Sequence, residues 1–166
     1  MATALFINRT DLVKNSIIDG NVDTDKFIQF VKIAQQIDVQ NILGTDLYNK
    51  ISSDITNGTL SGDYLSLVVD YVQPMLIWFA QVNYIPFAAY QIKNGGIYKH
   101  TSETAVNVDK DEVDFLVKKA RDYANYYAER FIDYMSFNNN KFPEYNTNTN
   151  EDISPDTKSD FNDWVI

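Results

Sequence analysis

Apolar residues recur at helical spacing along most of this 166-residue chain, and polar turn residues separate the apolar stretches. The clearest case is Phe27, Phe30, Val31, Ala34 and Ile37, which repeat every three to four residues. This period places the five side chains on one face of a helix. Similar stretches along the chain predict a mainly α-helical bundle of about five helices.

Capping residues predict where the first helices begin and end. Thr10 and Thr24 are expected to be the N-caps of the first two helices, because a threonine hydroxyl accepts from a free backbone N–H. Gly44 is expected to end the second helix, since glycine readily adopts the left-handed conformation found there. Thr45 is then expected to cap a third helix. After a polar loop the chain becomes helical again near Asp63.

A long uncharged segment, Tyr71–Ile92, occupies the middle of the chain. Its length would permit a transmembrane span. No basic flank orients it, however, and five residues interrupt it: Gln73, Gln81, Asn83, Pro86 and Gln91. We therefore expect a buried central helix with Pro74 in a first turn, a kink at Pro86, and an end at Gly95-Gly96.

Beyond the glycine pair, Ile97–Val108 is expected to form a short β-hairpin or an extended arm. Asp109 then caps a last helix, Lys110–Asn138, which would be about 43 Å long. This helix carries small residues at i, i+4 and i+8, namely Ala120, Ala124 and Ala128. Small residues let another helix approach closely, and that helix can belong to the same chain or to another subunit.

The last residues, 139–166, differ in character from the rest. They are rich in Asn and Thr and carry two lysines against six carboxylates, which predicts a disordered or loosely attached tail. The tail ends in an apolar group that contains Phe161, Trp164 and Ile166. This group either docks on another component or covers the chain's own core. The predicted organisation is a helical domain over 1–138, including the arm 97–108, and an extended tail over 139–166.

Composition restricts the partners. The net charge of −9 argues against gripping nucleic acid, whereas an acidic wall would let DNA pass without sticking. The chain has no cysteine, which excludes disulfides and is compatible with a reducing cytosol. Eleven Tyr and ten Phe are many for this length, and they fit either a large core or interfaces.

No residue pattern predicts catalysis, a cofactor or a metal. His100 is the only histidine, and we expect it in a surface loop. The segment Asp19–Asp25 superficially looks like a calcium loop, but Thr24 and Phe30 stand where an EF-hand needs glycine and glutamate. Asp109 and the three carboxylates that follow it are explained by the positive end of the helix dipole.

Four segments, taken in their order, carry a resemblance to a known family. The run Gly95–Glu103 follows Pro86–Tyr90, and Arg130–Met135 and Phe142–Tyr145 lie downstream. In this order they resemble head–tail connector (adaptor or ring) proteins of tailed bacteriophages, particularly those of the crAss-like group. The resemblance extends from Phe6 to Ile166.

The resemblance implies a virion structural protein without catalysis. Such proteins form a ring, commonly of about twelve copies, beneath the portal protein. The ring extends the DNA channel, lets double-stranded DNA pass without specific binding, and presents a platform to other connector or tail proteins. We accordingly expect assembly in the host cytoplasm, location at the head–tail junction and no membrane. The alternatives are another virion role, such as tail completion or cargo, and a small non-catalytic binding or regulatory module.

The sites implied by the resemblance are interfaces. Subunit contacts are expected from the long helix, and contacts with the portal or the next ring from the arm and the tail. The candidate interface residues are Tyr98 and His100 in the arm, Ala120, Ala124, Tyr127 and Ala128 in the helix, and Phe161, Trp164 and Ile166 in the tail.

Overall fold

The computed structural model describes residues 4–17, 24–88, 90–93, 96–99 and 109–157, and this part of the chain is mainly helical, as predicted. The helices form five continuous stretches, two of which contain a π-helical turn. They are α1 (Arg9–Asn15); α2 (Thr24–Ala34), η1 (Gln35–Val39) and α3 (Gln40–Leu43); α4 (Thr45–Asn57); α5 (Gly62–Leu67), η2 (Val68–Val72) and α6 (Gln73–Ala88); and α7 (Lys110–Asn138).

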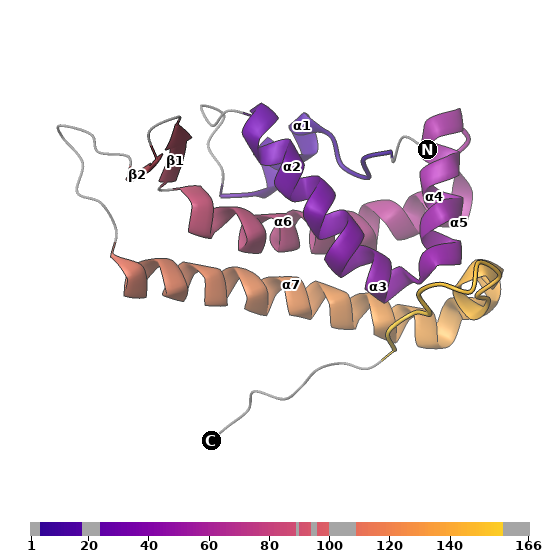
Figure 1. Cartoon of the computed structure of the whole chain (residues 1–166). Helices are drawn as coiled ribbons and strands as arrows, with labels where there is room; N and C mark the ends of the chain where they lie inside the picture. The colour runs from indigo at the N-terminus through magenta and orange to yellow at the C-terminus, as the bar shows by residue number, and fades with distance from the viewer. Residues whose placement is uncertain (1–3, 18–23, 89, 94–95, 100–108, 158–166) are drawn as a thin grey trace, which may run out of the picture.

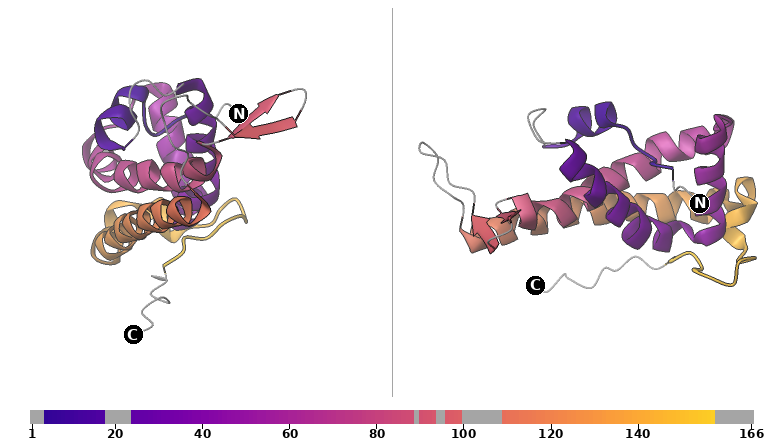
Figure 2. Two further views of the ribbon diagram at one scale, coloured as in Figure 1. Left: turned by 90° about the vertical axis from the view of Figure 1, so that its left-hand side faces the viewer. Right: turned by 45° about the horizontal axis from the view of Figure 1, so that its top comes forward.

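The long helix α7 runs along one side of the molecule, with α6 alongside it and α2 on the other side of α6 (Figures 1 and 2). The core lies between these layers, where Phe27 of α2, Leu76 of α6 and Phe131 of α7 are fully buried. Aromatic contacts join α6 and the turn before it to α7. Trp78 packs on Tyr123 with ring centroids 4.7 Å apart, and Tyr71 stacks on Tyr134 at 4.3 Å.

The uncharged segment forms the central helix of the bundle. By length and composition alone, the helix Gly62–Ala88 could cross a membrane. In this fold, 56% of its most apolar window is buried inside the protein, with Met75 and Ala80 fully covered. A helix that is apolar all round is typical of such a buried position. Pro74 lies in the first turn of α6, directly after the π-helical turn η2, and Pro86 lies in its last turn.

Helix ends test the capping predictions. Asp109 is the N-cap of α7, and the predicted bounds of this helix are confirmed. The prediction for Thr10 is wrong, because Asn8 caps α1 through a capping box with Asp11. The prediction for Thr45 is also wrong. Its hydroxyl makes no cap and instead bonds with the C-terminal segment described below.

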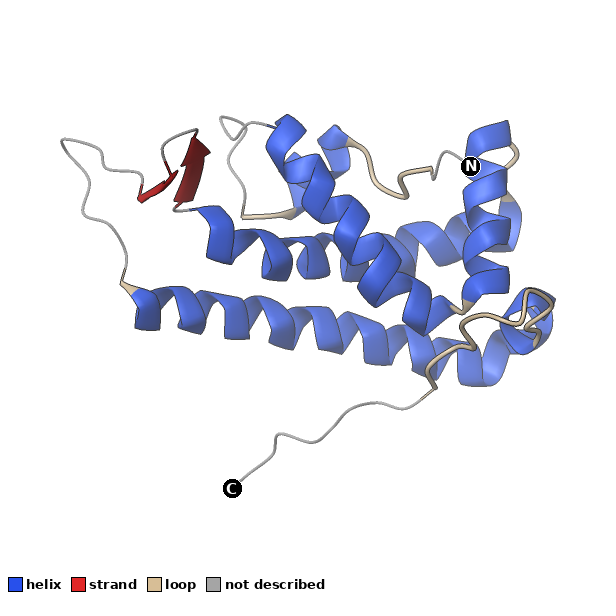
Figure 3. Ribbon diagram, in the orientation of Figure 1, coloured by secondary structure: helices blue, strands red, loops and turns tan. Residues whose placement is uncertain are grey.

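A β-hairpin follows α6, and it starts earlier than predicted. The helix ends at Ala88, and β1 (Tyr90–Lys93) pairs antiparallel with β2 (Gly96–Lys99) (Figure 3). The dipeptide between the strands is Asn94-Gly95, a strong hairpin sequence. Gly96 therefore opens the second strand and does not end the central helix. Residues 100–108 of the expected arm lie outside the described residues.

The expected loose tail is wrong for residues 139–157. Two short 3₁₀ helices, η3 (Asn139–Lys141) and η4 (Pro143–Asn146), fold this segment back onto the helices. Phe142 is fully buried and Tyr145 nearly so, and Phe142 packs edge-on against Tyr64 of α5. The helical domain therefore extends through residue 157, because the polar segment contains two aromatic residues that complete the core.

Candidate interaction surfaces

The C-terminal segment, residues 139–157, is bound to the helices through several contacts. Four of its hydrogen bonds go to one carboxylate, that of Asp46 in the first turn of α4. It accepts four hydrogen bonds, from the Thr147 hydroxyl (2.7 Å), the Thr149 N–H (2.8 Å) and hydroxyl (2.9 Å), and the Asn150 amide (2.9 Å). These bonds, led by the Thr149 N–H, lower the pKa of Asp46 to about 2. Hydrogen bonds to an ionised carboxylate favour its charged form. The threonine and asparagine residues of the segment thus supply the hydrogen-bond donors that bind it to Asp46.

A second set of contacts closes the segment against the end of α3. The Thr45 N–H donates to the Ile153 carbonyl at 2.9 Å, and its hydroxyl donates to Asp152 at 2.9 Å. Gly44 has φ +76°, and a Cβ there would lie 2.7 Å from the ring of Pro155. These contacts place Asp156, whose N–H donates to the Asn41 carbonyl at 2.8 Å, beside α3.

A groove of about 250 Å³ lies where η1, α3, α6, α7 and this C-terminal segment meet. Apolar side chains that include Ile37, Phe79 and Ile132 line it. Three carboxylates belong to the same lining: Asp38, Glu129 and Asp156. We call this site the acidic groove.

Two carboxylates of the acidic groove have raised pKa values. Burial raises the pKa of Asp38, and a hydrogen bond from Asn83 and the charge of Arg121 oppose this effect in part. Burial and the nearby charge of Asp133 raise the pKa of Glu129. A cation placed in the groove would stabilise both ionised forms. Within the described residues, no group of three or more His, Cys, Asp or Glu side chains could hold a metal ion.

The outer face of α7 is uncovered and aromatic. Phe115, Tyr126 and Phe137 are 60%, 60% and 86% exposed. They are spaced by eleven residues, close to three helical turns, so they share one face over about 33 Å. The buried residues Ala120, Ala124 and Ala128 lie about half a turn around the same helix, so this face is opposite the side that meets the core. The eleven-residue spacing of these aromatic residues is present in the sequence, but the sequence alone does not show which face of the helix is exposed.

The small-residue stripe lies on the opposite face of α7. Ala120, Ala124 and Ala128 are buried inside the chain, and Tyr127 packs partly against the core. Of the two possibilities left open by the sequence, the structure shows contact within the chain. The three alanines are buried within the described part of the chain, and α7 packs along α6.

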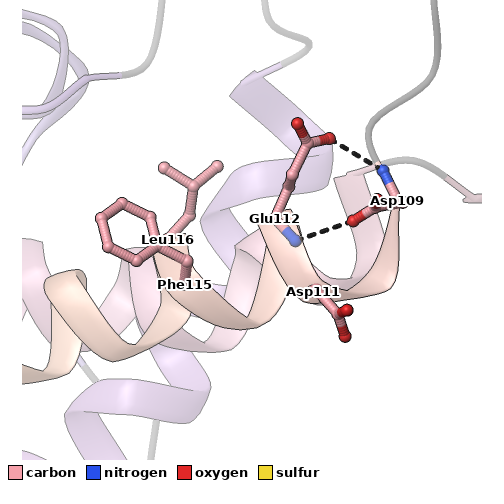
Figure 4. A pocket seen from close by; sticks show the side chains of 5 residues that line it. All are labelled: Asp109, Asp111, Glu112, Phe115 and Leu116. Carbon is pink, nitrogen blue, oxygen red and sulfur yellow. Dashed lines mark hydrogen bonds between the residues drawn. The ribbon is translucent and has the colours of Figure 1, made fainter.

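An open hollow lies at the start of α7, next to Phe115 and Leu116 (Figure 4). Asp109 accepts from the Glu112 N–H at 2.9 Å, and Glu112 accepts from the Asp109 N–H at 3.0 Å. Asp111 lies in the same first turn. This capping box and the helix dipole account for the acidic residues here, as predicted.

The β1–β2 hairpin projects from the helical layers (Figure 2). Tyr98 lies in β2, opposite Gln91 of β1. The other arm and tail candidates, His100, Phe161, Trp164 and Ile166, lie outside the described residues, as does most of Asp19–Asp25.

The chain belongs to DUF6712, a family of unknown function, whose model matches residues 39–154. The matched region includes both partners of the Asp46 contacts and the whole of α7. No curated protein and no solved structure matches the chain.

Proposed function

We propose that the protein is a virion structural protein that forms a ring, of about twelve copies, at the head–tail junction below the portal. The ring would extend the DNA channel and serve as a docking platform for tail components. The observation that carries the proposal is the outer face of α7. Three large, exposed aromatic side chains follow one helix face there, opposite its buried face.

Physical arguments support an assembly role over that of an isolated module. Exposed aromatic residues gathered on one face are typical of protein–protein contacts. The projecting hairpin offers a second contact element that differs from the first, as head-to-tail packing in a ring requires. The net charge of −9 suits a channel wall that does not hold DNA. The resemblance of the four sequence segments to head–tail connector proteins supplies the location.

Gold labelling of virus particles that contain this chain tests the location. Antibodies raised against the folded protein should label particles from which the tail has detached, at the exposed vertex below the portal. Labelling along the tail or inside the head would favour tail completion or cargo and contradict the proposal. Absence of the chain from purified particles, measured by mass spectrometry, would leave the non-catalytic binding module as the better function.

A further inference from the structure

We propose that two copies of the protein pair as an antiparallel dimer through the outer faces of α7, with a twofold axis at Tyr126. This inference goes beyond the proposed ring and concerns the protein before assembly. A twofold contact reverses one copy relative to the other, whereas the copies of a ring around DNA all point the same way. The dimer would therefore cover the outer face until assembly and would open before a copy joins the ring.

The exposed aromatic residues of α7 are symmetric about Tyr126. Phe115 lies eleven residues before it and Phe137 eleven residues after it. At about 100° per residue, both lie within about 20° of Tyr126 around the helix axis. When a second α7 lies on this face in the opposite direction, Tyr126 meets its own copy. Phe115 of each chain then reaches Phe137 of the other.

The charged residues of the same face are complementary in this arrangement. Lys119 and Asp133 lie seven residues on either side of Tyr126. Asp122 and Arg130 lie four residues on either side of it. All four are exposed and lie within about 40° of Tyr126 around the axis. In the antiparallel pair Lys119 therefore faces Asp133 of the other copy, and Asp122 likewise faces Arg130. The twofold axis repeats each of these contacts.

A parallel pair would not produce these contacts. With two α7 helices in register and in the same direction, Lys119 meets Lys119 and Asp133 meets Asp133. Like charges placed across an interface oppose association. The order of the charges along the face therefore favours the antiparallel direction.

The other charged groups near this face are compatible with the pairing. Glu112 lies fourteen residues before Tyr126, so it faces Asn140, beyond the end of the other α7. Arg130 lies over the ring of Tyr71, 5.0 Å from the ring centroid. A guanidinium that stacks on a ring still presents N–H groups at its edge, so Arg130 can donate to a carboxylate without leaving the ring.

The aromatic side chains supply most of the area that a dimer needs. Phe115, Tyr126 and Phe137 are between 60% and 86% exposed. Full burial of a Phe or Tyr side chain covers about 150–250 Å². Six such side chains, three from each copy, would therefore contribute on the order of 800 Å². The paired charged side chains add to this, which brings the total near the roughly 1,000 Å² of a specific interface.

Site-specific cross-linking tests the arrangement, because the chain has no cysteine of its own. One full-length preparation carries Lys118→Cys, and a second, with a different tag, carries Ser136→Cys. Both positions are exposed, and they lie five helical turns apart at the same edge of the face. In the antiparallel dimer, position 118 of one copy lies beside position 136 of the other. The two copies of either position lie about 24–30 Å apart along the axis.

We expect a short bismaleimide to join the two tagged chains in the mixture and to give no dimer in either preparation alone. Replacing Ser136→Cys with Thr56→Cys, an exposed position on α4, should give only background product. A mixed product no greater than this control would overturn the dimer. Strong products within each single preparation would indicate parallel pairing and overturn the antiparallel arrangement.

Charge reversal tests the lysine–carboxylate pairs. Asp133→Lys sets two lysines opposite each other and should raise the dimer dissociation constant, measured by sedimentation equilibrium, at least about tenfold. Adding Lys119→Asp to the same chain should recover most of the affinity. Asp114→Lys is the matched control, because it makes the same change in net charge at an exposed position about 120° around the helix from Tyr126. Equal effects of Asp133→Lys and Asp114→Lys, or no recovery in the double variant, would overturn the pairing.

Mass photometry of the wild-type protein and of the cross-linked mixture separates this inference from the ring proposal. Salt weakens exposed charge pairs, so we expect the yield of the cross-linked dimer to fall as salt rises. Rings without this dimer at any salt concentration would overturn the dimer alone. The dimer without rings at any salt concentration would support the dimer and count against the ring. Absence of both species would contradict both proposals.

Discussion

Thr149 donates both its backbone N–H, at 2.8 Å, and its hydroxyl, at 2.9 Å, to one carboxylate oxygen of Asp46, across 103 residues of sequence. The Asp46 carboxylate also lies in the first turn of α4, where the helix dipole favours a negative charge. This pairing fixes the C-terminal segment against the bundle and helps to shape the acidic groove, since Asp156 follows a few residues later.

The Asp46 contacts predict acid-dependent stability. The folded-state pKa of about 2 lies below the ordinary value of 3.8, so the ionised group stabilises the fold above about pH 4. This contribution is lost as the pH falls toward 2. Melting temperatures of wild type and Asp46→Asn, measured from pH 2 to 6, should differ most at the upper end and converge at the lower. Asp70→Asn, at an exposed site, should leave the melting temperature nearly unchanged. A difference independent of pH would contradict this explanation.

Any side chain at Gly44 is predicted to lower the stability of the fold. Its φ of +76° disfavours other residues, and an added Cβ would lie 2.7 Å from Pro155. Gly44→Ala should lower the free energy of unfolding by about 2–4 kcal/mol. Gly58→Ala is the control for a left-handed backbone alone, because Gly58 has φ +66° and ψ 26° with nothing within 4 Å of its added Cβ. It should cost only about 1–2 kcal/mol. Equal losses in urea unfolding would show that neither the Pro155 contact nor the ψ of 156° at Gly44 adds to the cost.

Ala124 is predicted to be a packing position inside the chain. It is fully buried, so Ala124→Leu should overpack α7 against its neighbours and cost about 1–3 kcal/mol. Lys118→Leu, at an exposed position of the same helix, should change stability by only about 0.5 kcal/mol. Chemical denaturation of both variants checks this. An unchanged unfolding midpoint for Ala124→Leu would mean that the helix is free to move away.

Truncation tests whether the helices need the packed residues of the C-terminal segment. Deleting 139–166 removes Phe142 and Tyr145 from the core, and loss of one buried Phe alone costs about 3–5 kcal/mol. We expect this variant to be unfolded or strongly destabilised by circular dichroism. A stable fold after this deletion would show that the helices do not need the segment.

The sequence predicts elements whose cause is local, and fails where distant partners decide. Asp109 is followed at the right spacing by Glu112, so the start of α7 can be read directly. Asn94-Gly95 is an equally local signal for a hairpin. The uncharged segment Tyr71–Ile92 favours a longer helix instead, so the sequence does not predict that β1 begins at Tyr90. The conformation of Thr45 and of residues 139–157 depends on contacts between residues more than 100 positions apart in the sequence. The spacing of apolar residues along the chain does not predict such contacts.

The same distinction between local and distant causes applies to the candidate sites. The alanine stripe is visible in the sequence, yet only the folded chain shows that these alanines are buried within it. The eleven-residue spacing of Phe115, Tyr126 and Phe137 is also visible, and it identifies the outer face once the inner face is known. The acidic groove draws residues from four helical elements and the C-terminal segment, so local pattern could not have revealed it.

Mass photometry across ionic strength tests the central claim, assembly into a ring, most directly. Each copy carries a net charge of −9, and salt screens the long-range repulsion that this charge produces between copies. We predict a discrete species of about twelve copies whose population rises from about 0.01 M to 0.5 M salt. Monomers at every salt and protein concentration, or rings that form best at the lowest salt, would contradict the account.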